Sequence, residues 1–89
     1  MSKYYYCYIL KSIKRNKIYI GFTKDLKNRL TLHNKGAVNA TKANYPYSLI
    51  FYSAYRHKAD ALAAEKYYKT TAGWRRIMKM LVSENLKMG

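Results

Sequence analysis

Four acidic residues limit the chemistry that this chain of 89 residues can perform: Asp25, Asp60, Glu65 and Glu84. Enzymes that hold two metal ions need several carboxylates that converge on one point. If the chain hydrolyses phosphodiesters, it must therefore bind its metal through one carboxylate. Cationic or phenolic groups must then supply the remaining roles.

Glu65 is the best metal-ligand candidate among the four acids, because helix starts and the chain end explain the other three. It follows Ala61 by four positions and Ala64 by one, so its face of the predicted helix is apolar. An apolar face is an unusual place for a carboxylate without a partner. The alternative is a surface glutamate paired with Lys69 at i+4, an interaction worth a few tenths of a kcal/mol.

Two tyrosines are expected on neighbouring strands. The aromatic segment 4–10 and the segment 17–22 both favour strands, and the polar residues between them suggest a hairpin. Because strand side chains alternate between faces, Tyr8 shares a face with the tyrosines two and four positions before it. A hairpin tip near Ile13–Lys14 places Tyr8 almost opposite Tyr19.

An arginine and a histidine are expected on one face of the first helix. Thr23 is a fair N-cap for this helix and Gly36 is a good C′ residue. His33 continues a stripe begun by two leucines, and Arg29 lies four positions before it, on the same face. Taken alone, Arg29 could lie in solvent or contact phosphate, and His33 could be a satisfied, partly buried histidine.

The remaining elements complete an α+β fold. After a polar loop over 37–48, residues 49–55 favour a third strand, and 58–69 form an Ala-rich helix. A last helix is expected to begin near Gly73. The order ββαβαα predicts a small three-stranded antiparallel sheet flanked by helices, in a single domain over residues 1–89.

These residues match a known family in their types and order. The sequence carries Tyr6-Cys7-Tyr8, Tyr19-Ile20-Gly21, Asp25-Leu26 with Arg29, His33-Asn34 with Gly36, Pro46, and Glu65-Lys66. In this it resembles the GIY-YIG nuclease superfamily, specifically its small stand-alone bacterial-type members. The second motif is literally Tyr19-Ile20-Gly21. In the first, Tyr6 and Cys7 stand where the family name has Gly and Ile, and Tyr8 is kept.

The resemblance implies hydrolysis of nucleic-acid phosphodiesters with one divalent metal ion, Mg²⁺ or Mn²⁺, bound by Glu65. Tyr8, with its pKa lowered from about 10 by nearby cationic charge, would take a proton from the attacking water. Tyr19 would position the water or the phosphate. Arg29 would offset charge that develops on the phosphoryl group, and His33 would accept a hydrogen bond from a tyrosine or orient it.

Two features of some family members are missing or hard to place. Some carry a further histidine in the loop after the first helix, and residues 39–44 contain none. Some use an asparagine late in the fold, for which Asn85 is a weak candidate. Cys7 suits a buried strand position and is expected to pack in the core rather than to react.

The charge of the chain points to a polyanionic partner. Lys and Arg number 18 against 4 acids, a formal net charge of +14, while 49% hydrophobic residues exclude a disordered basic tail. Phosphate contacts give affinity without sequence information, so recognition by nucleic-acid shape is expected.

Tyr45 and Tyr47 could stack on an unpaired base or pack under their loop. The lysines expected to contact nucleic acid are Lys24, Lys27, Lys35, Lys42 and Lys69.

The leading hypothesis is a metal-dependent endonuclease that acts on DNA rather than RNA, directed by structure in repair or recombination. A targeting protein could supply its specificity. The alternative is a non-catalytic, basic nucleic-acid-binding module with a degenerate nuclease fold. With no long apolar run and no signal peptide, the expected location is the cytoplasm, with the nucleoid or the nucleus as alternatives.

Overall fold

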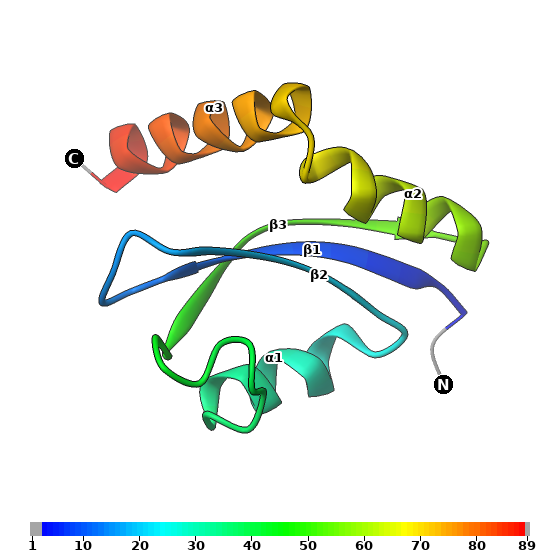
Figure 1. Cartoon of the computed structure of the whole chain (residues 1–89), viewed down its shortest axis with the longest axis horizontal. Helices are drawn as coiled ribbons and strands as arrows, with labels where there is room; N and C mark the ends of the chain where they lie inside the picture. The colour runs from blue at the N-terminus through cyan, green and yellow to red at the C-terminus, as the bar shows by residue number, and fades with distance from the viewer. Residues whose placement is uncertain (1–2, 89) are drawn as a thin grey trace.

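Three strands and three helices follow one another in the order ββαβαα, which confirms the predicted α+β class (Figure 1). The computed structural model describes residues 3–88, with the side chains of residues 3–83. The elements are β1 (Tyr5–Ser12), β2 (Ile18–Thr23), α1 (Leu26–Asn34), β3 (Tyr47–Tyr55), α2 (Lys58–Tyr68) and α3 (Thr71–Met88). None of the described helices is long and apolar enough to span a bilayer.

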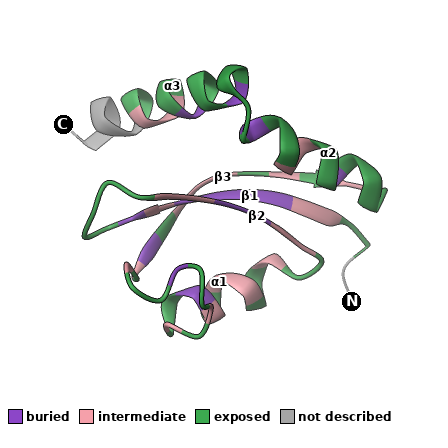
Figure 2. Ribbon diagram, in the orientation of Figure 1, coloured by how far each residue is buried: buried purple, intermediate pink, exposed green. Residues whose placement is uncertain are grey.

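The sheet has the strand order β2-β1-β3, and both pairings are antiparallel. Helix α1 lies on one face of the sheet, and α2 and α3 lie on the other (Figure 1). The central strand β1 is the most deeply buried element (Figure 2). Each side chain of β1 therefore belongs to one of two layers, according to its position along the strand.

Alternation along β1 divides the core into two clusters. Cys7 and Ile9 pack with Tyr68 and Ile77 in the layer of α2 and α3. Tyr8 lies in the other cluster, against partly buried residues of α1. The predicted alternation and the buried position of Cys7 are confirmed.

The turn of the β1–β2 hairpin corrects the predicted register. The Ser12 backbone N–H donates to the Lys17 carbonyl at 2.9 Å, and Ser12 Oγ accepts from two backbone N–H groups inside the turn. The tip therefore lies one residue later than predicted. As a result Tyr8 is paired with Gly21 rather than with Tyr19, which is paired with Leu10. Tyr8 and Tyr19 remain diagonal neighbours on one face.

The two ends of α1 are capped in different ways. Asp25 Oδ1 accepts from the Asn28 N–H at 3.2 Å, so Asp25 is the N-cap and the prediction of Thr23 was wrong. Thr23 lies two residues before the N-cap, and its Oγ1 accepts a hydrogen bond from the Asp25 N–H at 3.1 Å. At the other end Gly36 has φ 72°, as its predicted C′ role requires. Its N–H donates to the His33 carbonyl at 3.1 Å, which ends the helix directly after the candidate histidine.

A β-bulge interrupts the alternation in β3. Leu49 is paired with Leu10, but Phe51 is paired with Ile9, so Ile50 is an extra residue. Because of this extra residue, Leu49 and Tyr52 lie on the same face of the sheet although an odd number of positions separates them. That face is the one covered by α1.

Helix α3 begins at Thr71, two positions before the predicted start at Gly73. The hydroxyl of Thr70 accepts from the Gly73 N–H at 3.2 Å, a typical N-cap interaction. The apolar periodicity of α3 begins only at Trp74, so it does not mark the first turn of the helix.

Candidate active site

The structure brings together four of the five predicted site residues. Tyr8 comes from β1, Tyr19 from β2, and Arg29 and His33 from one face of α1. The ring centroids of Tyr8 and His33 are 5.6 Å apart, those of Tyr19 and His33 5.0 Å, and those of the two tyrosines 6.1 Å. The two strands and the last turn of α1 thus form one compact site.

A chain of hydrogen bonds runs through the centre of this site. The Tyr8 hydroxyl lies 2.8 Å from His33 Nε2, and His33 Nδ1 lies 2.7 Å from Thr41 Oγ1. Thr41 in turn has the Val38 carbonyl as an acceptor at 3.5 Å. We assign Tyr8 as the donor to Nε2 and Nδ1–H as the donor to Thr41, the arrangement that leaves the Thr41 proton for that carbonyl.

Two residues that support the histidine were not predicted. Thr41 is fully buried and holds the far side of the imidazole. The Asn34 side chain accepts from the Tyr47 N–H at 2.7 Å and donates to its carbonyl at 3.2 Å, which fastens the end of α1 to β3. The only available signal for Thr41 was its place in the segment where some family members carry a histidine. Tyr47 itself is buried at the start of β3, in the cluster that contains Tyr8 and Leu10.

Gly21 provides the space that the two tyrosines occupy. A Cβ atom at this position would lie 2.5 Å from the Tyr8 hydroxyl oxygen and 2.7 Å from Cε2 of Tyr19. Both distances are far below van der Waals contact, and the rings that would have to move are packed. The glycine of the second motif is therefore required for packing against the aromatic rings.

Burial sets the acidity of Tyr8. Desolvation raises the pKa of this fully buried phenol to about 12, and a hydrogen bond from Arg29 and its positive charge only partly oppose the shift. The prediction of a lowered pKa was wrong, because the cost of burying a phenolate exceeds the effect of the nearby cation. Tyr8 is protonated in the resting site, and Tyr19 is the more exposed of the two phenols.

Arg29 is positively charged, and one of its N–H donors makes no hydrogen bond to the described residues. Its interactions with Tyr8 raise its pKa further, so its charge is permanent. Among the described residues, its Nε is buried and has no hydrogen-bond partner. A buried donor without a partner costs about 1–3 kcal/mol, which an anionic ligand can recover.

Burial, and secondly the charge of Arg29, lowers the pKa of His33 to about 4. Below pH 6.5 the unfolded chain therefore takes up a proton that the folded chain excludes. We expect the free energy of unfolding to fall by on the order of 3 kcal/mol between pH 6.5 and pH 4. Urea unfolding across this range measures the loss.

Two histidine variants provide the controls for this prediction. In His33→Gln the pH dependence in this window should flatten, whatever the absolute stability of the variant. His57 is exposed, and His57→Gln should retain the wild-type slope. A wild-type profile that is flat between pH 6.5 and pH 4 would contradict the buried, neutral histidine.

Glu65, the fifth predicted site residue, does not lie with the two tyrosines, the arginine and the histidine. It lies on α2, in the layer on the opposite face of the sheet, where its charge contributes to the raised pKa of Cys7 after desolvation. Its carboxylate is 3.3 Å from Lys69 Nζ and 23% exposed, the i+4 pair that the sequence offered as an alternative. A nucleic acid in contact with both Glu65 and Arg29 would have to pass around an edge of the sheet.

Glu65 offers a single carboxylate to a metal ion, as Asp25 and Asp60 do elsewhere on the described surface. No group of three or more His, Cys, Asp and Glu side chains comes together in the described part of the chain. Both nitrogens of His33 are engaged, and Arg29 is cationic. A single, partly exposed carboxylate does suit Mg²⁺, which keeps several waters and takes further ligands from substrate phosphates. Asn85 lies outside the residues whose side chains are described.

The predicted nucleic-acid-binding lysines divide between the two layers of the molecule. Lys24, Lys27, Lys35 and Lys42 are exposed on the turn before α1, on α1 and on the loop after it. Lys69 is exposed at the end of α2 and pairs with Glu65. Four of the five lysines thus surround the layer that contains Arg29.

The fold and the site define the class of this protein. Residues 4–77 match the GIY-YIG catalytic domain, and the chain belongs to this family of nucleases. Similar proteins include UPF0213 proteins of Streptococcus pyogenes serotypes M3 (strain MGAS315), M1 and M4 (strain MGAS10750). Each is 36% identical over 69 residues, which cover 76% of this chain and 74% of the relative. No solved structure matches the chain.

Proposed function

We propose that the protein is a metal-dependent endonuclease that hydrolyses phosphodiester bonds of DNA, directed by DNA structure in repair or recombination. One observation carries the proposal most directly. The permanently charged Arg29, whose Nε has no partner in the described part of the chain, lies beside a tyrosine that is hydrogen-bonded to a neutral imidazole. A phosphate acceptor and a proton relay are the two parts that this hydrolysis needs from side chains.

In this mechanism Arg29 binds a phosphate oxygen and offsets the charge that develops during attack. The bound anion also removes one cause of the low pKa of His33, because it neutralises the arginine charge. Tyr8 can then pass its proton to His33 Nε2 while it accepts one from the attacking water. Tyr19, which solvent reaches, orients the water or the phosphate. A divalent ion held by Glu65 would supply Lewis-acid stabilisation of the phosphoryl group, which requires the carboxylate to reach the phosphate that Arg29 binds.

The position of Glu65 favours a second candidate function. If the carboxylate remains in the other layer when nucleic acid binds, the protein is a non-catalytic nucleic-acid-binding module. Its formal net charge of +14 suffices for salt-sensitive binding in that case. A protein partner could then be the source of any cleavage.

Cleavage assays separate the two functions. Supercoiled plasmid and a branched duplex are incubated with Mg²⁺, with Mn²⁺ and with EDTA, for the wild type and for Tyr8→Phe. The nuclease predicts metal-dependent cleavage that Tyr8→Phe reduces by about 10²- to 10⁴-fold, the range for loss of general acid–base catalysis, with binding unchanged. Binding that weakens with salt, without cleavage of either substrate, would establish the binding module instead.

A further inference from the structure

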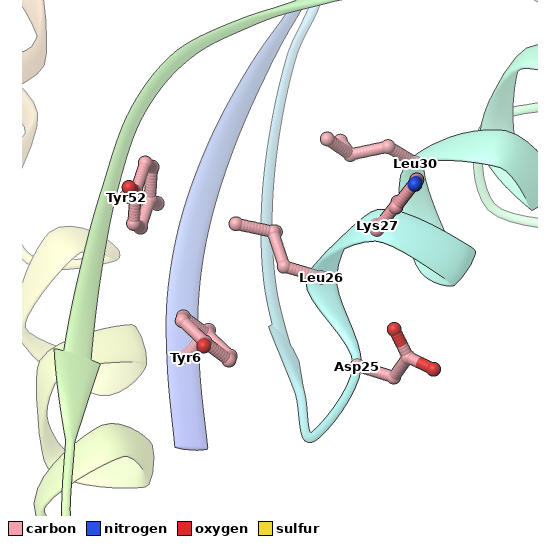
Figure 3. A pocket seen from close by; sticks show the side chains of 6 residues that line it. All are labelled: Tyr6, Asp25, Leu26, Lys27, Leu30 and Tyr52. Atoms are coloured by element: carbon pink, nitrogen blue, oxygen red, sulfur yellow. The ribbon is translucent and has the colours of Figure 1, made fainter. Parts of the chain in front are cut away.

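An open hollow of about 380 Å³ lies on the α1 face of the sheet, next to the site but outside it (Figure 3). The strands supply two aromatic side chains, and the first turns of α1 supply the opposite wall. The lining residues are Tyr6, Asp25, Leu26, Lys27, Leu30 and Tyr52. Leu26 and Leu30 also pack against the cluster that contains Tyr8, so the hollow and the site share a wall.

Two aromatic rings dominate the strand side of the hollow. The ring centroids of Tyr6 and Tyr52 are 6.1 Å apart with an interplanar angle of 59°. Tyr52 is 51% exposed, so about half of its side chain is open to a ligand. It is also the direct cross-strand partner of Tyr8.

The charge around the hollow indicates an anionic occupant. Lys27 lines it, and Lys24 is exposed in the turn just before α1. Asp25 is the only acid in the lining, and Oδ1 of its carboxylate serves as the N-cap acceptor of α1. Figure 3 shows this carboxylate directed away from the two rings. An exposed aromatic ring with cations at its margin suits a nucleic-acid base attached to its phosphates.

We infer that Tyr6 and Tyr52 form a stacking platform for one unpaired base of the nucleic acid. The inference rests on the proposed function and narrows its substrate to nucleic acids with an unpaired nucleotide, such as a flap or a bulge. Tyr6 precedes Tyr8 by two positions, or about 7 Å along the strand, so neighbouring nucleotides can reach both the platform and the site. Because α1 forms a wall beside the rings, a base must leave the duplex stack to reach them.

The test measures binding in EDTA, without any need for cleavage. Three DNA duplexes are compared: one with a single bulged base, one with an abasic bulge, and one fully paired. The wild type should bind the bulged base about tenfold or more tightly than the abasic bulge, the effect of one base–aromatic stack. Tyr52→Ala should abolish this preference and leave the affinity for the fully paired duplex unchanged.

Two further variants control for strand stability and for aromatic residues in general. Tyr52→Trp keeps a stacking surface and should retain the preference, whereas Tyr52→Thr keeps strand propensity and should lose it. Tyr67 is 43% exposed on α2, in the opposite layer, and Tyr67→Ala should behave like the wild type. Thermal unfolding of each variant verifies that it is folded.

The proposed stacking platform is contradicted if the wild type binds the duplex with the bulged base and the duplex with the abasic bulge equally tightly. It is also contradicted if Tyr52→Ala keeps the preference for the bulged base. It is also wrong if Tyr67→Ala removes the preference as fully as Tyr52→Ala does. Failure of the proposed function has a different signature: no cleavage in metal, with the bulged-base preference intact. The two results are therefore distinguishable.

Discussion

Metal-stimulated cleavage is expected to fall by about a hundredfold or more in Glu65→Gln, while nucleic-acid binding is retained. A metal ion contributes several kcal/mol to transition-state stabilisation. Among the four acids, Glu65 is the one that lies neither at the start of a helix nor near the chain end. The variant keeps the size of the side chain. It loses only an exposed i+4 pair with Lys69 at 3.3 Å, which contributes little to folding.

The matched control for Glu65→Gln is Asp60→Asn, which removes an exposed acid from the first turn of the same helix. Its cleavage rate should equal that of the wild type at each metal concentration. Equal metal dependence in Glu65→Gln and the wild type would identify Glu65 as an ordinary helix residue.

Arg29→Met is expected to lower the cleavage rate by about 10²- to 10³-fold, the usual effect of losing one donor to a developing oxyanion. The fold should be weakened little, because the lost hydrogen bond to Tyr8 is offset by removal of a buried Nε that has no partner among the described residues, and the apolar stem is kept. The pKa of His33 should also rise, since the arginine charge is one of the two causes of its low value. NMR titration of the imidazole measures this rise.

Arg15 in the hairpin turn is an exposed arginine of equal charge and serves as the control. Arg15→Met should lower binding slightly at low salt and leave both the cleavage rate and the pKa of His33 unchanged. If the two variants lose cleavage to the same extent, the contribution of Arg29 is general phosphate attraction rather than a role in the site.

Most of the fold could be predicted from local signals. Alternation of aromatic and apolar residues defined β1, and the glycine after α1 defined the end of that helix. The spacing of Arg29 and His33 followed from helical periodicity alone. These features depend on neighbours in sequence, which periodicity describes well.

The features that could not be predicted depend on contacts between distant segments. The hydrogen bond from His33 to Thr41 requires the loop after α1 to fold back over the imidazole. The raised pKa of Tyr8 follows from its complete burial, which a strand pattern does not reveal. The layer in which Glu65 lies is set by the side of the sheet that α2 covers, and the order of motifs along the chain does not specify that side.

The bulge at Ile50 has a consequence for comparisons between relatives of this protein. Since the extra residue reverses the alternation, a tyrosine that follows the bulge in β3 faces α1 only when its distance from Leu49 is odd. A relative without the bulge would present a tyrosine at the aligned position on the opposite face, however similar its sequence. Alignments that search for an equivalent of Tyr52 must therefore match its spacing from the bulge rather than its identity alone.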